Sequence, residues 1–136
     1  MKKLILLTIL FQSLFAYSQE FGRKDSLRGF LSPERLCYDV NYYHLKISVD
    51  PEEKFIKGYS EIHFEAQSDF ELIQIDLFDN MRISEILFEG RTQNYTREFN
   101  AVFVNFDTIV KKGQQSYIRV YYEGNPRVAI NPPWDG

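Results

Sequence analysis

The chain has 136 residues, a formal net charge of −3 and a single cysteine. Its acidic balance argues against nucleic acid or an anionic lipid surface as a partner, because both need a basic face. One cysteine cannot form an intrachain disulfide, so a small disulfide-stapled scaffold is excluded. We expect Cys37 to be a small buried residue, with a free thiol or an intermolecular bridge as the alternatives.

Residues 1–18 have the composition of a secretory signal peptide: two lysines near the start, an apolar stretch over residues 4–15, and small residues at Ala16 and Ser18. We expect cleavage after Ser18 and export to the periplasm or the extracellular space. An uncleaved anchor is disfavoured, because the apolar stretch is shorter than the ~20 residues that span a bilayer. Removing the segment leaves 118 residues with a net charge of −5 and no membrane attachment.

Residues 19–36 are polar and rich in Gly, Ser and Arg, without hydrophobic periodicity. This composition predicts an extended mature N-terminus. One helical turn is allowed after Ser32, which can act as the N-cap, because Pro33 is favoured at the first helical position.

Residues 38–66 follow, in which Tyr43–Val49 and Ile56–Ala66 alternate between two faces, and they predict a β-hairpin. Asp50 and Pro51 favour a turn, since proline presets φ and aspartate accepts backbone hydrogen bonds. Gly58 lies where a side chain should pack, which predicts a bulge or the close approach of another backbone. The apolar positions expected to hold this scaffold are Val40, Leu45, Ile47, Ile62 and Phe64.

Further short strands are predicted over Leu72–Leu77, Met81–Phe88, Thr92–Glu98, Ala101–Phe106 and Ser116–Tyr122. The alternation in the second of these breaks between Glu85 and Ile86, as a β-bulge would cause. The fourth is apolar and β-branched and is expected in the centre of a sheet, whereas the polar third is expected at an edge. Seven strands and no long helix predict an all-β domain over residues 37–124, an antiparallel β-sandwich or saddle-shaped sheet.

Catalytic motifs are absent from the sequence: there is no H-E-x-x-H, no G-x-S-x-G, no phosphate-binding glycine loop and no Cys-x-x-Cys. The best local candidate is the run from Glu61 through His63 to Glu65, which could bind a divalent cation if His44 reached the same face. A turn near Glu52 would leave the two histidines about three residues apart along the strands, too far for one ion. We therefore expect a solvated face with cross-strand charge pairs, and assign no catalytic, cofactor or metal residue.

Residues 125–136 differ in character, with three prolines and the only tryptophan. A domain seldom ends on an apolar anchor without a polar tail, so we expect the natural chain to continue beyond Gly136.

Residues Asp39–Asp50 have the pattern Asp-Val-x-x-Tyr-x-Leu-x-Ile-x-Val-Asp. This pattern resembles the opening of the N-terminal domain in the aminopeptidase N family of zinc metallopeptidases. The following strand agrees through its hydrophobic-x-Gly start at Ile56 and its Ile-x-Phe end at Phe64. Residues 120–124 resemble the family's Tyr-x-Gly strand. The Pro-Pro-Trp-Asp-Gly end departs from the usual family pattern and resembles an exported bacterial branch.

This resemblance implies a non-catalytic β domain that packs on a separate catalytic domain of the same chain and shapes the access of peptide substrates. Zinc would be bound in that downstream domain, through two histidines of H-E-x-x-H and a later glutamate. The alternative is a free-standing secreted β-sandwich that binds a protein or a glycan without catalysis.

Overall fold

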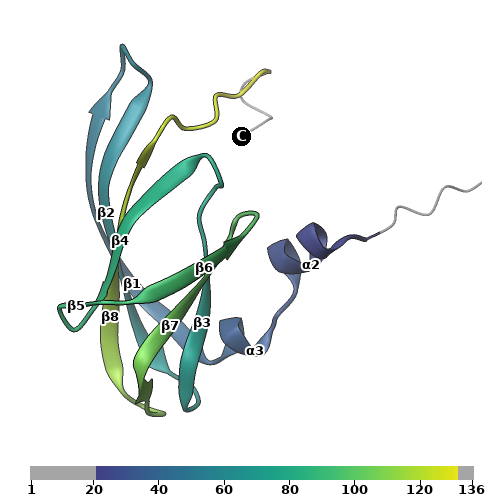
Figure 1. Ribbon diagram of the computed structural model, residues 1–136, viewed down its shortest axis with the longest axis vertical. Helices are drawn as coiled ribbons and strands as arrows, with labels where there is room; N and C mark the ends of the chain where they lie inside the picture. The colour runs from purple at the N-terminus through teal and green to yellow at the C-terminus, as the bar shows by residue number, and fades with distance from the viewer. Residues whose placement is uncertain (1–20, 132–136) are drawn as a thin grey trace, which may run out of the picture.

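The structure is a computed structural model that describes residues 21–131 (Figure 1). The predicted signal peptide and the Pro132–Gly136 motif lie outside the described residues. The elements are helices α2 (Arg23–Gly29) and α3 (Pro33–Leu36) and strands β1 (Tyr38–Asp50), β2 (Phe55–Ala66), β3 (Phe70–Asp76), β4 (Met81–Phe88), β5 (Arg91–Thr92), β6 (Asn94–Glu98), β7 (Ala101–Val110) and β8 (Gln115–Gly124). No helix within residues 21–131 is long and apolar enough to cross a membrane.

The strands form two antiparallel sheets, which confirms the all-β prediction. The larger sheet has the order β1-β2-β8-β4-β5, and the smaller has the order β3-β7-β6. Strand β7 lies at the centre of the smaller sheet and β6 at its edge, as their apolar and polar compositions predict. The predicted strand over Thr92–Glu98 is divided at Gln93, whose buried side chain accepts a hydrogen bond from the Asp107 backbone N–H at 3.2 Å. The chain passes there from the larger sheet to the smaller one.

The β1–β2 hairpin is the longest element pair and has the predicted turn. Its register runs from Tyr38 opposite Ala66 to Asp50 opposite Phe55. Asp50 Oδ1 accepts hydrogen bonds from the backbone N–H groups of the next two non-proline residues, at 3.1 and 3.0 Å. Gly58 shows the close backbone approach: a Cβ there would lie 2.0 Å from the carbonyl oxygen of Lys46. The glycine is therefore required by its neighbour strand, and the register shows no bulge at this position.

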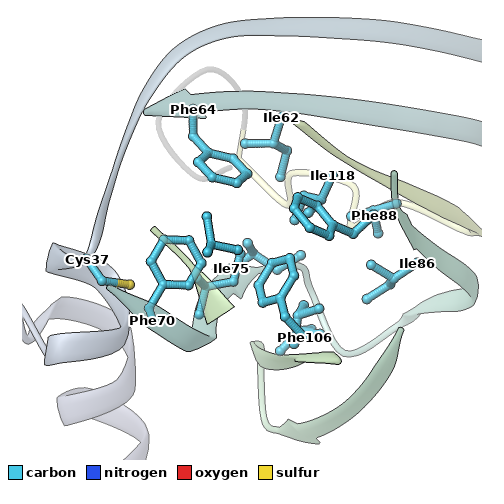
Figure 2. Packing of buried hydrophobic residues seen from close by; sticks show 14 of the residues in the cluster. Cys37, Ile62, Phe64, Phe70, Ile75, Ile86, Phe88, Phe106 and Ile118 are labelled. Carbon is cyan, nitrogen blue, oxygen red and sulfur yellow. The ribbon is translucent and has the colours of Figure 1, made fainter. Parts of the chain in front are cut away.

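The core lies between the two sheets (Figure 2). Ile62, Phe64, Ile86, Phe88 and Ile118 come from the larger sheet and face Phe70, Ile75 and Phe106 of the smaller sheet, with Cys37 at one side. Strand β4 keeps Ile83 and Ile86 on the same inner face because the register shifts between Ile83 and Glu85, close to the predicted bulge. Burial of Cys37 is confirmed.

Leu45 is not part of this core, so the prediction that it holds the scaffold is wrong. Its side chain is 57% exposed, because the smaller sheet covers only one end of the hairpin and the other end extends past it (Figure 1). Val40 and Ile47 are partly exposed, whereas Ile62 and Phe64 are buried as predicted.

The segment predicted to be extended before the hairpin is helical in part. The turn after Ser32 forms as expected, but α2 was not predicted. Helix α2 is held by tertiary contacts: its Leu27 is buried, and the Leu27 carbonyl accepts hydrogen bonds from Arg35 at 2.9 Å and from Gln74 at 3.0 Å. Arg35 in turn forms a salt bridge with Asp76 of β3 at 2.6 Å. These partners are distant in sequence, so periodicity within the segment does not reveal them.

Candidate functional site

The outer face of the larger sheet gathers the histidines, a glutamate and an arginine from three adjacent strands. His44 on β1 lies opposite Glu61 on β2, and Glu61 lies opposite Arg119 on β8. His63 is two residues along β2 on the same face. Strand alternation therefore produces the cluster: these side chains point away from the core that the neighbouring positions Ile62 and Ile118 fill.

Glu61 is the centre of this cluster, and its residue is only 8% exposed. One carboxylate oxygen accepts hydrogen bonds from Arg119 through Nε, at 2.8 Å, and through an Nη group. The other oxygen lies 3.1 Å from Nδ1 of His44 and 3.4 Å from Nε2 of His63. The carboxylate has partners on both oxygens, which is what a largely buried charge requires.

Aromatic rings surround the cluster on the same face. The Arg119 guanidinium lies 4.7 Å from the ring centroid of Tyr59, and its Nη1 donates to the Tyr121 hydroxyl at 3.2 Å. His63 stacks on Tyr117 at 4.9 Å and meets Tyr42 edge-on at 5.3 Å. The rings cover the ion pair from several sides and lower its exposure to water.

The two histidines lie closer together than the sequence argument allowed. The predicted offset of about three residues between the two histidines is wrong: His44 lies opposite Glu61, two residues from His63, and both imidazoles reach the same Glu61 oxygen. Glu65 is separate from them and accepts from Gln115 at 3.1 Å. Within the described residues, no group of three His, Cys, Asp or Glu side chains has the geometry of a metal site. The Arg119 cation beside the carboxylate also opposes a second cation there, so this cluster does not fit a divalent metal ion.

The hydrogen bonds from Arg119 hold the pKa of Glu61 below its ordinary value of 4.5, with further lowering by the two histidines and an opposing contribution from burial. The hydrogen bonds to Tyr121 and Glu61 raise the pKa of Arg119, so the arginine keeps its charge. The cluster is therefore an ion pair with the predicted cross-strand partners, but Glu61 at its centre is buried, whereas the sequence predicts a solvated face.

In a Glu61→Gln variant, the free energy of unfolding should depend less on pH. A carboxyl whose pKa is lowered on folding contributes stability above its ordinary pKa and loses it as the pH falls through the folded value. The variant should lose about 1–2 kcal/mol near neutral pH, and its curve should be flatter between roughly pH 5 and pH 3. Urea unfolding across this range measures both effects. Glu71→Gln, an exposed carboxylate on β3, is the control, and an equal flattening there would contradict the role of Glu61.

Cys37 is not a reactive thiol. Burial raises its pKa to about 11, so the nucleophilic thiolate is scarce at neutral pH.

The inner face of the hairpin carries apolar side chains that no element within residues 21–131 covers. Tyr43, Leu45 and Val49 of β1 are 56%, 57% and 64% exposed. We call these three residues the apolar strip. They continue the face that forms the core further along the sheet, and a cavity of about 320 Å³ between the hairpin and β3 begins beside Tyr43 and Tyr122. Alternation in the sequence predicts this face correctly but does not tell whether anything packs on it.

No protein-family model matches this chain. No curated protein matches it either.

Solved structures do match the fold. An M1 zinc metallopeptidase from Deinococcus radiodurans has a TM-score of 0.64 and 22% identity over 78% of this chain and 25% of its own. A two-domain M1 zinc metallopeptidase mutant bound to L-arginine has a TM-score of 0.61 and 23% identity over 73% of this chain and 23% of its own. Leukotriene A4 hydrolase from Saccharomyces cerevisiae has a TM-score of 0.50 and 12% identity, over 63% of this chain and 15% of its own. This chain thus spans about a quarter or less of these proteins, and the likeness shows a shared fold.

Proposed function

We propose that residues 37–124 are the N-terminal β domain of an exported zinc metallopeptidase of the M1 family, the family that includes aminopeptidase N. Two independent observations support this assignment. The Asp39–Asp50 spacing and the Gly58 strand resemble the family in sequence, and M1 enzymes share the fold over about three quarters of this chain. The complete protein would remove N-terminal residues from peptides, with zinc and the catalytic residues in a domain downstream of the one described.

The domain's own role is to pack on the catalytic domain and to shape the access of substrate. The apolar strip is the observation that carries this role. Its three side chains are each more than half exposed on one face of an otherwise ordered hairpin, and contiguous exposed apolar surface of this kind marks an interaction site. A domain that follows in the same chain is the partner that the coverage of the matched enzymes favours.

Peptide substrates and export belong to the same proposal. One matched enzyme is bound to L-arginine, which supports a peptide-derived ligand for the complete protein. The composition of residues 1–18 supports export to the periplasm or the extracellular space.

Polar substitution of the apolar strip should have opposite effects in the two forms of the protein. In residues 19–136 alone, Leu45→Ser with Val49→Ser should reduce the binding of a hydrophobic dye by at least about twofold, because exposed apolar surface is removed. In the complete protein, the same change should cost about 3 kcal/mol, because two buried side chains are lost from an interface. Dye fluorescence and urea unfolding measure these effects.

Leu31→Ser with Leu36→Ser provides the matched control, since both leucines are exposed but lie outside the strip. It should reduce dye binding without destabilising the complete protein. If the strip variant leaves the stability of the complete protein unchanged, the strip is not the docking surface.

The reading frame after Gly136 separates this proposal from a free-standing secreted β-sandwich that binds a protein or a glycan. We expect it to continue into H-E-x-x-H, with a further glutamate on a following helix. An authentic stop codon at that point would favour the free-standing domain.

A further inference from the structure

A second concave surface lies between α2, the turns that lead into β4 and β7, and residues 127–130, and it meets the cavity described above at Asp76 and Leu77. It encloses about 660 Å³, within the range of ligand-binding clefts in proteins. The apolar part of its lining includes Leu27, Leu77, Phe78, Phe99 and Val128. Both phenylalanines are almost half exposed, at 48% and 46%. We call this surface the α2 groove.

Helix α2 is fixed at the side of the smaller sheet, so the groove has a defined wall. Arg23 forms a salt bridge with Glu98 of β6 at 2.9 Å, and Gln74 of β3 donates to the carbonyl of Leu27 at 3.0 Å. Figure 1 shows α2 beside the end of β6. The groove is therefore built by elements that tertiary contacts hold together.

Three cations line the groove: Lys24 and Arg28 on α2, and Arg127 on the opposite side. The acids around it are already paired. Asp76 binds Arg35 at 2.6 Å, and Asp79 binds Arg127 at 3.1 Å.

In the part of the chain that the structure describes, Lys24 and Arg28 form no salt bridge. The Lys24 ammonium instead lies 5.9 Å from the Phe99 ring centroid, and the Arg127 guanidinium lies 4.8 Å from that of Phe78. The result is a cationic rim over aromatic rings, in a protein whose net charge is −3.

We propose that the α2 groove binds an extended peptide segment in which carboxylate side chains alternate with apolar ones. The aromatic and aliphatic lining offers contacts for the apolar side chains, and Lys24 and Arg28 offer charge partners for the carboxylates. Positive charge that lacks an internal partner favours an acidic segment over a neutral or basic one. The proposal concerns a surface other than the apolar strip, so it can fail while the proposed function stands, and the converse also holds.

Fluorescence anisotropy with a labelled peptide, Gly-Leu-Asp-Phe-Glu-Leu-Gly, tests this proposal on residues 19–136. We expect saturable binding that weakens at higher salt, since exposed charge pairs are screened. Lys24→Glu with Arg28→Glu should weaken it at least about tenfold. Lys46→Glu with Lys112→Glu makes the same charge change at exposed positions outside the groove and should leave binding nearly unchanged. Phe78→Ala with Phe99→Ala, which keeps both cations, should also weaken binding, so the test does not depend on one variant folding.

Several results would overturn the proposal. One is the absence of binding up to roughly 1 mM peptide. Another is that a peptide with Asn and Gln in place of Asp and Glu binds as tightly as the acidic peptide. A third is that the control variant, Lys46→Glu with Lys112→Glu, weakens binding as much as Lys24→Glu with Arg28→Glu does. If sedimentation shows a dimer that Lys24→Glu with Arg28→Glu converts to a monomer, the groove is occupied by a second copy of the chain instead.

Discussion

A Gly58→Ala variant is expected to lose at least about 3 kcal/mol of folding stability, the upper part of the usual cost of overpacking. The added Cβ would lie 2.0 Å from the Lys46 carbonyl oxygen and 2.8 Å from Cα of Ile47. Both atoms belong to the backbone of β1, so no side chain can rotate away to make room. The two strands must separate at this point, which weakens the hydrogen bonds that set the hairpin register.

Gly29→Ala is the matched control for this variant, because a Cβ at Gly29 meets nothing within 4 Å. It should change stability by no more than about 0.5 kcal/mol. Urea unfolding followed by circular dichroism measures both variants. A Gly58→Ala protein as stable as its Gly29→Ala counterpart would contradict the close approach of β1 and β2.

A Phe64→Ala variant should cost about 3–5 kcal/mol, the usual range when a buried phenylalanine is truncated. Phe64 is 1% exposed, and its ring contacts those of Tyr38 and Phe70 with centroid separations of 5.9 and 6.0 Å. Phe70 belongs to the smaller sheet, so the substitution removes contacts that join the two sheets. Because native domains are stable by only about 5–15 kcal/mol, this loss is a large share of the total.

Phe30→Ala removes the same number of atoms from a side chain that is 66% exposed. It should cost less than about 0.5 kcal/mol, and thermal unfolding compares the two directly. Equal losses from the two substitutions would mean that the sheets do not share one core around Phe64.

The strands could be predicted from the sequence because each has a local period-two pattern. The hairpin turn at Asp50 and Pro51 is equally local, since the hydrogen bonds of the aspartate reach only the next few residues. For Gly58 the sequence predicts a bulge or a close backbone approach, because a glycine interrupts an apolar face, and the structure shows the close approach. The pattern does not predict how the strands divide between two sheets, because the chain changes sheet after β2, after β3, at Gln93 and after β7, and the pairing depends on contacts far along the chain.

The candidate site was only partly predictable for the same reason. The sequence identifies the polar face with Glu61 and His63, but the exact register decides which residues meet. The expected offset of about three residues separated His44 from His63, whereas the structure places their ring nitrogens 3.1 and 3.4 Å from the same Glu61 oxygen. Arg119 lies 58 positions from Glu61 and was not linked to it at all. Helix α2 was not predicted because the residues that hold it, Gln74 and Glu98, lie on strands distant in sequence.

Metal analysis of the complete gene product, beside residues 19–136 alone, tests the central claim most directly. If the chain is the N-terminal domain of an M1 zinc metallopeptidase, the complete protein should hold one zinc ion per chain, bound by its downstream domain. Residues 19–136 alone should bind zinc weakly or not at all and should not cleave an aminoacyl reporter. A zinc-free complete protein, or stoichiometric zinc on residues 19–136, would contradict the account.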